Sequence, residues 1–316
     1  MTSMLRQIMS FHPILIKKKT LTFMHRLYSL TFRFSPFLLT LLCLSACSPA
    51  SVVNFLTPRG DFDVVKNIHY GSADRQVFDV YTPSNVTPNQ AVIVFVHGGS
   101  WASGSKNDYL FVGQAFSEMG YVTVVPNYRL YPDVEFPEFV EDIAQAIAKL
   151  PELLPTNKCV DPKNVILVGH SAGAHTAAML ATAPEYLKNA GFDRDLTAFI
   201  GMAGPYDLPL KHELVIEKFT SVTNDIDANP LHLATAAAPP TLLFHGEQDT
   251  TAYPFHTLYL AKRLEKLGVP VESHLYHKTD HVELVGALSS KLRFMNPVYA
   301  DISNYLHKNG FDQACN

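Results

Sequence analysis

Residues 164–179 read Asn-Val-Ile-Leu-Val-Gly-His-Ser-Ala-Gly-Ala-His-Thr-Ala-Ala-Met, and they indicate a strand followed at once by a helix. Residues 165–168 form the short, β-branched apolar run that is typical of a buried parallel strand. Small and apolar residues suited to a helix begin at Ala172. Between them lies Gly169-His170-Ser171-Ala172-Gly173, a G-x-S-x-G pattern in the setting that this motif needs.

The two glycines of this pattern have a steric reason. A strand that reverses sharply into a helix brings the residues beside Ser171 so close that a Cβ would clash, so glycine is needed on both sides. We therefore expect Ser171 to be strained, with its hydroxyl exposed and a helix N-terminus behind it. The neighbouring His170 and His175 are interpreted as packing or pocket residues.

Composition describes an ordinary globular chain. Its 316 residues are 47% hydrophobic and 17% charged, which suits one large domain or two small ones. The net charge of -4, with both signs interspersed along the body of the chain, gives no electrostatic basis for binding nucleic acid.

The N-terminus has the pattern of an export signal. Lysines and arginines precede an apolar run at 37–46, which is ten residues long. A bilayer requires about 20 helical residues, whereas a signal-peptide core has about 7 to 15. The segment Leu44-Ser45-Ala46-Cys47 resembles the lipobox of bacterial lipoproteins, in which the cysteine is lipidated and becomes the mature N-terminus. In that family a residue such as Ser48 implies passage to the outer membrane.

These features predict a domain organisation. We expect a signal peptide at 1–46, of which 1–23 can be an over-extended start before Met24, an anchor linker at 47–62 and a catalytic domain at 63–316. The chain would be exported and held on a bacterial membrane, with the outer membrane favoured, facing the periplasm or the cell surface. A plain secretory signal or an uncleaved anchor is the alternative. In an oxidising compartment Cys159 and Cys315 can form one disulfide, or remain two free thiols.

The body of the chain alternates between predicted strands and helices, which indicates an α/β fold with a mostly parallel sheet covered by helices on both faces. Strands are expected at 64–69 and 76–81, both as edge strands, and at 91–96, 121–125, 165–168, 197–202, 241–245 and 271–276. Helices are expected at 108–119, 139–150, 255–267 and 298–307 and after Ser171. Residues 205–233 are too short for a domain-sized cap, so a small or minimal cap and an open pocket are expected.

A second motif follows the predicted central strand. The sequence His97-Gly98-Gly99-Ser100-Trp101 is typical of a loop whose backbone N–H groups bind the oxygen of a tetrahedral intermediate. The other N–H group in such a site belongs to the residue after the nucleophile, here Ala172. Gly98, Gly99, Ser100 and Ala172 are therefore the predicted oxyanion hole, and Trp101 is interpreted as packing for this loop.

A nucleophilic serine also needs a base and a carboxylate that orients it, in the chain order Ser, Asp, His. Asp249 lies on the loop after a strand, with Glu247 as its competitor. His281 lies on the loop beyond the last strand and is preferred as the base over His277 at the strand's end.

Together these motifs resemble an α/β-hydrolase of the His-Gly-Gly-x-Trp carboxylesterase group, similar to isoprenylcysteine methylesterases, kynurenine formamidases and BD-FAE proteins. The other segments that carry the resemblance are Asn127-Tyr128-Arg129-Leu130, Gly169–His175, Phe244–Asp249 and Lys278–His281. It implies Ser171 as nucleophile, Asp249 as orienting acid and His281 as base. The methylesterases tend to have Lys-Thr-His, where this chain inserts Asp280, which leaves the local register open.

The expected function is hydrolysis of small-molecule carboxylic esters through an acyl-enzyme. An aryl formamidase or other amidase on the same residues, or a non-catalytic binding lipoprotein on this fold, are the alternatives. No phosphate loop, dinucleotide fingerprint or zinc-ligand spacing occurs, so no cofactor and no metal are expected. The sequence does not give the oligomeric state.

Overall fold

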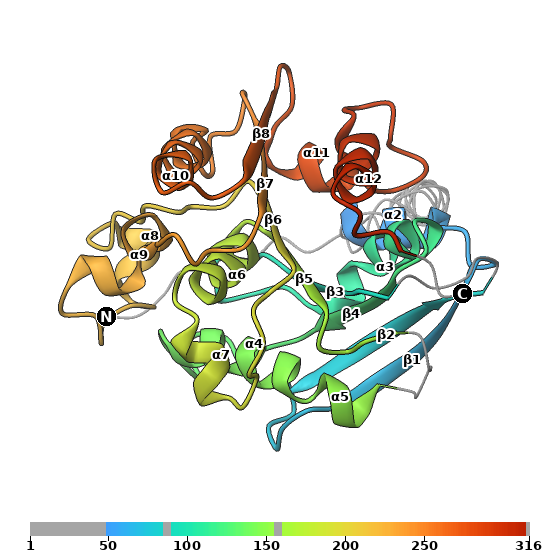
Figure 1. Ribbon diagram of the computed structural model, residues 1–316, viewed down its shortest axis with the longest axis horizontal. Coiled ribbons are helices and arrows are strands. Elements are labelled where there is room, and N and C mark those ends of the chain that lie inside the picture. Colours follow the sequence, from blue (N-terminus) through green and yellow to red (C-terminus); the bar gives the residue numbers. More distant parts are fainter. Residues whose placement is uncertain (1–48, 85–89, 155–159, 314–316) are drawn as a thin grey trace, which may run out of the picture. The chain divides into compact units, whose positions relative to one another are not determined.

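A sheet of eight strands forms the centre of the computed structural model, which describes residues 49–84, 90–154 and 160–313. The strand order is β1-β2-β4-β3-β5-β6-β7-β8, and every neighbouring pair from β4 to β8 is parallel (Figure 1). The strands are β1 (Phe62–His69), β2 (Val77–Pro83), β3 (Val92–Val96), β4 (Val122–Pro126), β5 (Val165–His170), β6 (Ala198–Met202), β7 (Thr241–Gly246) and β8 (Val271–Tyr276). The predicted mostly parallel α/β sheet is confirmed.

Helices cover both faces of this sheet. One face packs against α4 (Glu138–Ala148), α6 (Ala172–Thr182), α7 (Glu185–Asn189) and α10 (Phe255–Lys266). The other packs against α3 (Leu110–Glu118), α11 (His281–Gly286) and α12 (Val298–Lys308). The short elements are α2 (Pro49–Leu56), η1 (Lys106–Asp108), α5 (Leu150–Leu153), α8 (Glu213–Ile216), η2 (Asp225–Ala228) and α9 (Pro230–Leu233).

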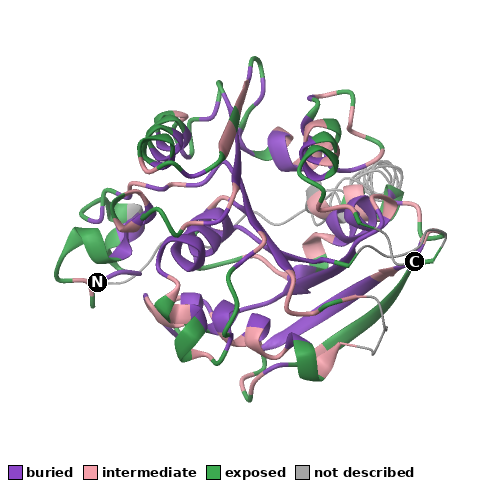
Figure 2. Ribbon diagram, in the orientation of Figure 1, coloured by how far each residue is buried: buried purple, intermediate pink, exposed green. Residues whose placement is uncertain are grey.

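The strands between the two helix layers are the most buried part of the sheet. All residues of β3, β4, β5, β6 and β7 are buried, and Figure 2 shows the middle of the sheet in the buried colour. A strand covered on both faces has no polar side, which explains the continuous apolar runs in the sequence. The edge strand β1, by contrast, is mostly exposed.

One strand prediction was wrong. Residues 76–81 were expected at an edge, but the corresponding strand β2 lies between β1 and β4 and pairs antiparallel with both. The apolar pattern of a strand shows how its faces are covered, not whether both of its hydrogen-bonding edges are paired. The short helices, among them α7, α9 and α11, were also not predicted, because four to six residues are too few to display a helical period.

The strand order places a crevice where function is expected. From β3 the chain crosses to β4 on one side, and from β4 it returns to β5 on the other side. Such a topological switch point leaves an open crevice at the carboxyl ends of the two inner strands, here β3 and β5. The segment His97–Trp101 follows β3 and Ser171 follows β5, so both predicted motifs meet there.

The predicted signal peptide, Cys47, Cys159 and Cys315 lie outside the described residues. Within the predicted linker, α2 packs on the domain, since Asn54 Nδ2 donates to the carbonyl of Asn107 at 2.8 Å and Asn54 Oδ1 accepts from the N–H of Phe111 at 3.3 Å. Across the part of the chain that the structure describes, none of the helices has the length and apolar character needed to span a bilayer.

Candidate active site

Ser171 occupies the sharp turn between β5 and α6. Its φ of 57° lies in the left-handed region, so the residue is strained as the sequence predicted. A Cβ on Gly169 would lie 2.4 Å from the carbonyl oxygen of Gly173, and one on Gly173 would lie 2.2 Å from that of Val96. Both contacts are closer than atoms allow, so the turn requires glycine at each position.

Ser171, His281 and Asp249 form a continuous hydrogen-bonded chain. The Ser171 hydroxyl donates to Nε2 of His281 at 2.8 Å, and Nδ1 of His281 donates to Oδ2 of Asp249 at 2.6 Å. His281 and Asp249 are buried, with exposed fractions of 9% and 2%. The structure therefore brings together three side chains that come from three different strand ends.

The Asp249 carboxylate is held by several donors. Its Oδ1 accepts from the backbone N–H groups of Thr251 at 2.8 Å and Ala252 at 2.9 Å. Burial alone raises the pKa of Asp249, but hydrogen bonds from His245, His281 and Ala252 outweigh it, so the pKa lies below its usual range. The carboxylate is therefore ionised at neutral pH, as the orientation of an imidazole requires.

His245, which the sequence analysis did not single out, is part of this network. Its Nε2–H donates to the carbonyl of Ala252 at 2.6 Å and lies 3.2 Å from Oδ2 of Asp249. Its Nδ1 lies 2.8 Å from Oγ1 of Thr257 on α10. The sequence feature that could have indicated His245 is its position within a buried apolar strand, because a buried imidazole needs hydrogen-bond partners.

Two further histidines brace the site. Nε2 of His170 donates to the carbonyl of His281 at 3.0 Å, and Nε2 of His175 donates to that of Ala228 at 2.9 Å. Burial lowers the pKa of His170 to about 3 and of His175 to about 4, so both are neutral at pH 7. Each ring thus connects a segment next to Ser171 to a distant loop, at His281 and at Ala228.

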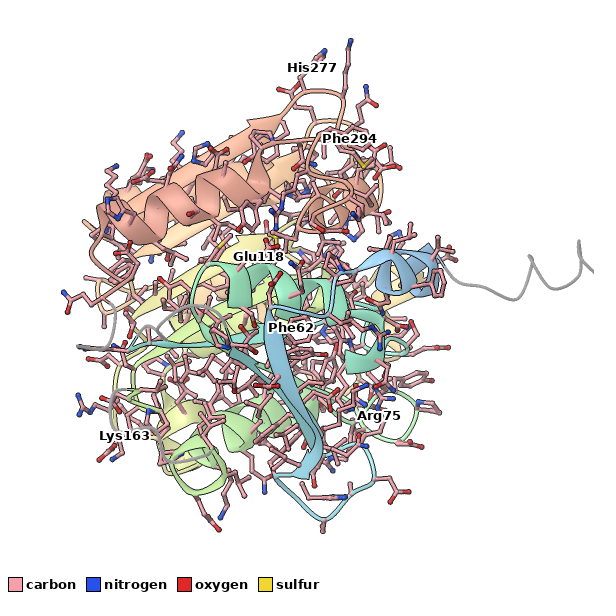
Figure 3. The ribbon with its side chains drawn as sticks, turned by 90° about the vertical axis from the view of Figure 1, so that its right-hand side faces the viewer. Phe62, Arg75, Glu118, Lys163, His277 and Phe294 are labelled. Carbon is pink, nitrogen blue, oxygen red and sulfur yellow. The ribbon has the colours of Figure 1, made fainter. Side chains whose placement is uncertain are left out.

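The competing residues His277 and Glu247 lie away from Ser171. Nδ1 of His277 lies 2.8 Å from Oε2 of Glu247, and their side chains are 75% and 45% exposed. Figure 3 shows His277 at the outer end of the molecule, on the loop after β8. The geometry places neither of them against the serine.

The loop after β3 presents backbone N–H groups beside Ser171. Gly99, Ser100 and Trp101 have φ values of 123°, 51° and 57°, so three consecutive residues adopt the left-handed region. Among the described residues, no hydrogen bond uses the N–H of Gly99 or Ser100. Ala172 is the first residue of α6, and such an N–H has no intrahelical acceptor. Gly98 lies so close that an added Cβ would be 2.8 Å from Cβ of Ser171.

The Asn-Tyr-Arg segment supports this loop. The Tyr128 hydroxyl donates to the carbonyl of His97 at 2.9 Å, and the Tyr128 ring stacks on the His97 ring. Arg75 donates to the carbonyls of Tyr128 and Gly104, at 2.7 Å and 2.9 Å. Trp101 is 3% exposed and packs its ring against His175 and Phe219, and its surface also lines the adjoining cavity.

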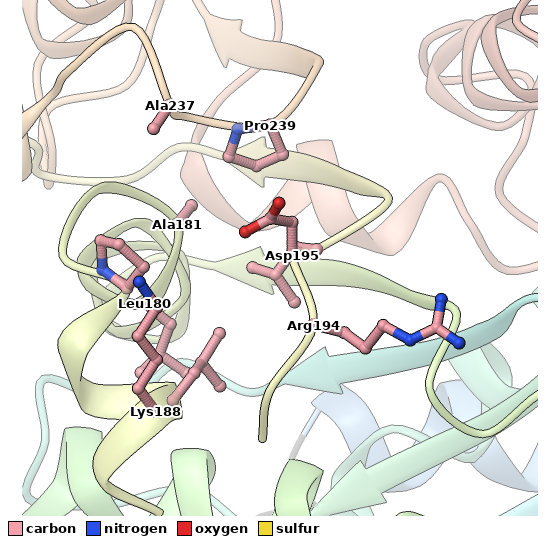
Figure 4. Close-up of a pocket in the computed structure, with 10 residues that line it drawn as sticks. Leu180, Ala181, Lys188, Arg194, Asp195, Ala237 and Pro239 are labelled. Atoms are coloured by element: carbon pink, nitrogen blue, oxygen red, sulfur yellow. The ribbon is translucent and has the colours of Figure 1, made fainter. Parts of the chain in front are cut away.

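A cavity of about 330 Å³ opens beside Ser171. Its walls include Ser100 and Trp101 of the loop after β3, residues between Pro205 and Val215, and residues between Thr251 and His256. A second hollow, lined in part by Leu180, Arg194, Asp195 and Pro239, is shown in Figure 4. With about 20 Å³ it has room for about one water molecule, so it is too small for a substrate.

The inserted Asp280 has a structural role. Its side chain accepts from the N–H groups of Val282 and Glu283, at 2.9 Å and 2.8 Å, and the Glu283 side chain accepts from the N–H of Asp280. This capping box starts α11 at His281, so the inserted residue places His281 at a helix N-terminus. In the described part of the chain, no cluster of side chains is arranged to hold a metal ion.

The fold and the site together define an α/β-hydrolase. The chain belongs to the BD-FAE family, whose model matches residues 78–264. It is 27% identical over 247 residues to a probable isoprenylcysteine alpha-carbonyl methylesterase of Arabidopsis thaliana, covering 70% of this chain and 51% of that one. It is 23% identical over 230 residues to a kynurenine formamidase of Danio rerio, covering 70% of this chain and 76% of that one. The chain thus spans about half the length of the plant relative.

Solved structures agree on the fold. Thermogutta terrifontis esterase 2, phosphoramylated by tabun, matches with a TM-score of 0.63 at 23% identity, covering 80% of this chain and 97% of that one. The resemblance drawn from the sequence motifs is confirmed at the level of family and fold.

Proposed function

We propose that this chain hydrolyses carboxylic esters through an acyl-enzyme formed on Ser171. The observation that carries the proposal is the hydrogen-bonded chain from Ser171 Oγ through His281 to Asp249. Beside it lie the N–H groups of Gly99 and Ser100, which have no hydrogen-bond partner among the described residues. The similarity to a probable isoprenylcysteine alpha-carbonyl methylesterase, which is named as an esterase, supports the same assignment. Ser171 acts as the nucleophile, His281 first as base and then as acid, and Asp249 as the carboxylate that orients His281.

The first half of the reaction acylates the serine. His281 Nε2 takes the hydroxyl proton as Ser171 Oγ forms a bond to the ester carbonyl carbon. The negative oxygen that results accepts hydrogen bonds from the N–H of Ala172 and from the loop of Gly98, Gly99 and Ser100. The bond to the alcohol oxygen then breaks, and this oxygen takes the proton from His281.

The second half releases the acid. Water gives a proton to His281 as its oxygen attacks the acyl carbon, and Ser171 Oγ leaves with that proton. Throughout, Asp249 accepts from Nδ1–H of His281 and keeps Nε2 free to act as base. No cofactor is needed for any of these steps.

The test compares Ser171→Ala with wild type in hydrolysis of p-nitrophenyl butyrate. We expect kcat to fall by at least about 10³-fold, because the nucleophile is lost. Ser273→Ala, which changes an exposed serine on β8, is the matched control and should retain wild-type turnover. Undiminished turnover by Ser171→Ala contradicts the proposal.

Amide hydrolysis is a second candidate, which the similarity to a kynurenine formamidase favours. The same three side chains serve an amide, because His281 can protonate a leaving nitrogen as well as an oxygen. A matched pair, such as the p-nitrophenyl ester and the p-nitroanilide of one acid, separates the two. A higher kcat/KM for the anilide would assign the enzyme as an amidase.

We also propose export and lipid anchoring through Cys47. The support is the Leu44-Ser45-Ala46-Cys47 sequence behind an apolar run of signal-peptide length. Each buried methylene of an acyl chain adds about 0.8 kcal/mol of membrane affinity. We expect the wild-type chain in the outer-membrane fraction and Cys47→Ala outside it; an unchanged distribution contradicts the anchor.

A further inference from the structure

We infer that the cavity beside Ser171 binds the acyl part of the ester, and that it selects an uncharged, medium-sized acyl group with a hydrogen-bond acceptor that His256 recognises. This inference rests on the proposed hydrolase function and specifies the substrate of that same site.

The lining of the cavity indicates which part of the ester it holds. The leaving alcohol has to lie at Nε2 of His281, from which it takes a proton. The cavity wall is built by the loop after β3, residues between Pro205 and Val215 and residues between Thr251 and His256, and no residue after β8 contributes to it. The alcohol therefore leaves on the His281 side, and the acyl group extends into the cavity.

Size and charge restrict this acyl group. A volume of about 330 Å³ lies at the lower end of the roughly 300 to 1,000 Å³ of small-molecule sites, which suits a chain of medium length. The described lining contains no lysine, arginine, aspartate or glutamate, and Trp101, Leu208, Val215 and Phe255 supply apolar surface. A charged acyl group would lose its hydration there without gaining an ionic partner.

His256 is a buried polar residue of this wall. It stands in the first turn of α10 and is 4% exposed, whereas the other imidazole of the lining, His212, is exposed. Nδ1 of His256 accepts the backbone N–H of Asp207 at 3.2 Å, so the ring carries its proton on Nε2. Burial and the nearby His245 lower the pKa of His256 to about 4, which keeps the ring neutral at pH 7.

This tautomer adds a donor, Nε2 of His256, to a residue of the cavity wall. No described residue accepts a hydrogen bond from Nε2 of His256, so a carbonyl, ether or hydroxyl oxygen of the acyl chain is the fitting partner. A substrate without such an oxygen displaces water from this donor and leaves it unpaired in the complex, which is the basis of discrimination.

The experiment measures kcat/KM for p-nitrophenyl octanoate, for its analogues with one methylene replaced by an ether oxygen at each position, and for the p-nitrophenyl half-ester of octanedioic acid. In wild type we expect one ether isomer to exceed octanoate by about tenfold, and the carboxylate to fall at least about 100-fold below it. His256→Phe should remove the ether preference, and His256→Gln, which restores an N–H donor, should recover part of it. His277→Gln is the control and should keep the wild-type pattern.

Equal rates for all ether isomers and octanoate in wild type, a preference that persists in His256→Phe, or ready turnover of the carboxylate would each overturn the inference. These outcomes differ from failure of the proposed function. In that case Ser171→Ala would turn over p-nitrophenyl acetate as fast as wild type does.

Discussion

His245 and Asp249 are in direct contact beneath the site, with Nε2 of the imidazole 3.2 Å from Oδ2 of the carboxylate and both side chains fully buried. The same Oδ2 accepts from Nδ1 of His281 at 2.6 Å. Asp249 is therefore fixed by His245 on one side while it orients His281 on the other. In the proposed mechanism we therefore expect the orientation of His281 towards Ser171 to depend on this contact.

Replacing His245 by phenylalanine should lower kcat for p-nitrophenyl butyrate by about tenfold or more, because the Asp249 loop loses two hydrogen bonds and a small misplacement of a catalytic group is costly. KM should change little. Thr257→Val, which removes only the outer partner of His245, should have a smaller effect. A folded His245→Phe enzyme with wild-type kcat would show that Asp249 does not need this support.

Separate substitutions of His281 and His277 test which of these two histidines is the base. His281→Gln should lose activity by about the same factor as Ser171→Ala, since members of a triad act as a unit. His277→Gln removes only an exposed pair with Glu247, which contributes about 1 kcal/mol or less to stability, and should remain fully active. The reverse result in p-nitrophenyl ester assays would assign the base to His277.

Tyr128→Phe tests the support of the oxyanion loop. The change deletes the hydrogen bond to the carbonyl of His97 and leaves that buried acceptor unpaired, which should cost about 1 to 3 kcal/mol of stability. We expect kcat to fall by about tenfold with little change in KM, because the loop N–H groups interact with the oxyanion only in the transition state. Unchanged kcat in this variant would separate the loop from catalysis.

Buried histidines predict a pH dependence of folding. In the folded chain the pKa of His97 and of His175 is lowered by burial to about 4, below the value near 6.5 of an unfolded histidine. Between these values the unfolded state binds the extra protons, so the free energy of unfolding should fall as the pH drops from 6.5 towards 4. Each such group contributes up to about 1.4 kcal/mol per pH unit.

Urea unfolding at several pH values measures this slope. His175→Gln removes one titrating group and should reduce the slope by about 1.4 kcal/mol per pH unit. A variant with the same slope as wild type would mean that His175 has the same pKa in the folded and unfolded states, which would contradict the prediction.

The sequence predicted those parts of the site that lie at strand ends. Ser171, Asp249 and His281 each follow a recognisable apolar strand, and the carboxyl ends of parallel strands share one edge of the sheet. His245 and His256 were not predicted, because their partners Thr257 and Asp207 come from other segments and only folding brings them close. A side chain whose role depends on a non-local contact leaves no local pattern.

The same limit applies to the fold. The eight strands were located by their apolar runs, but the interior position of β2 depends on its pairing with β1, which no local pattern encodes. In the sequence Asp280 is only an insertion into the motif. Its role as the N-cap of α11 depends on the helix itself, which is too short to be predicted.

Labelling with a fluorophosphonate followed by peptide mass spectrometry tests the central claim most directly, because the probe reacts with a serine that a base has activated. We expect one adduct, on the peptide that contains Ser171, and we expect it to be lost in His281→Gln and after denaturation. A native, folded protein that acquires no adduct at Ser171, or acquires it on another serine, would contradict the account and favour a binding protein on a hydrolase fold.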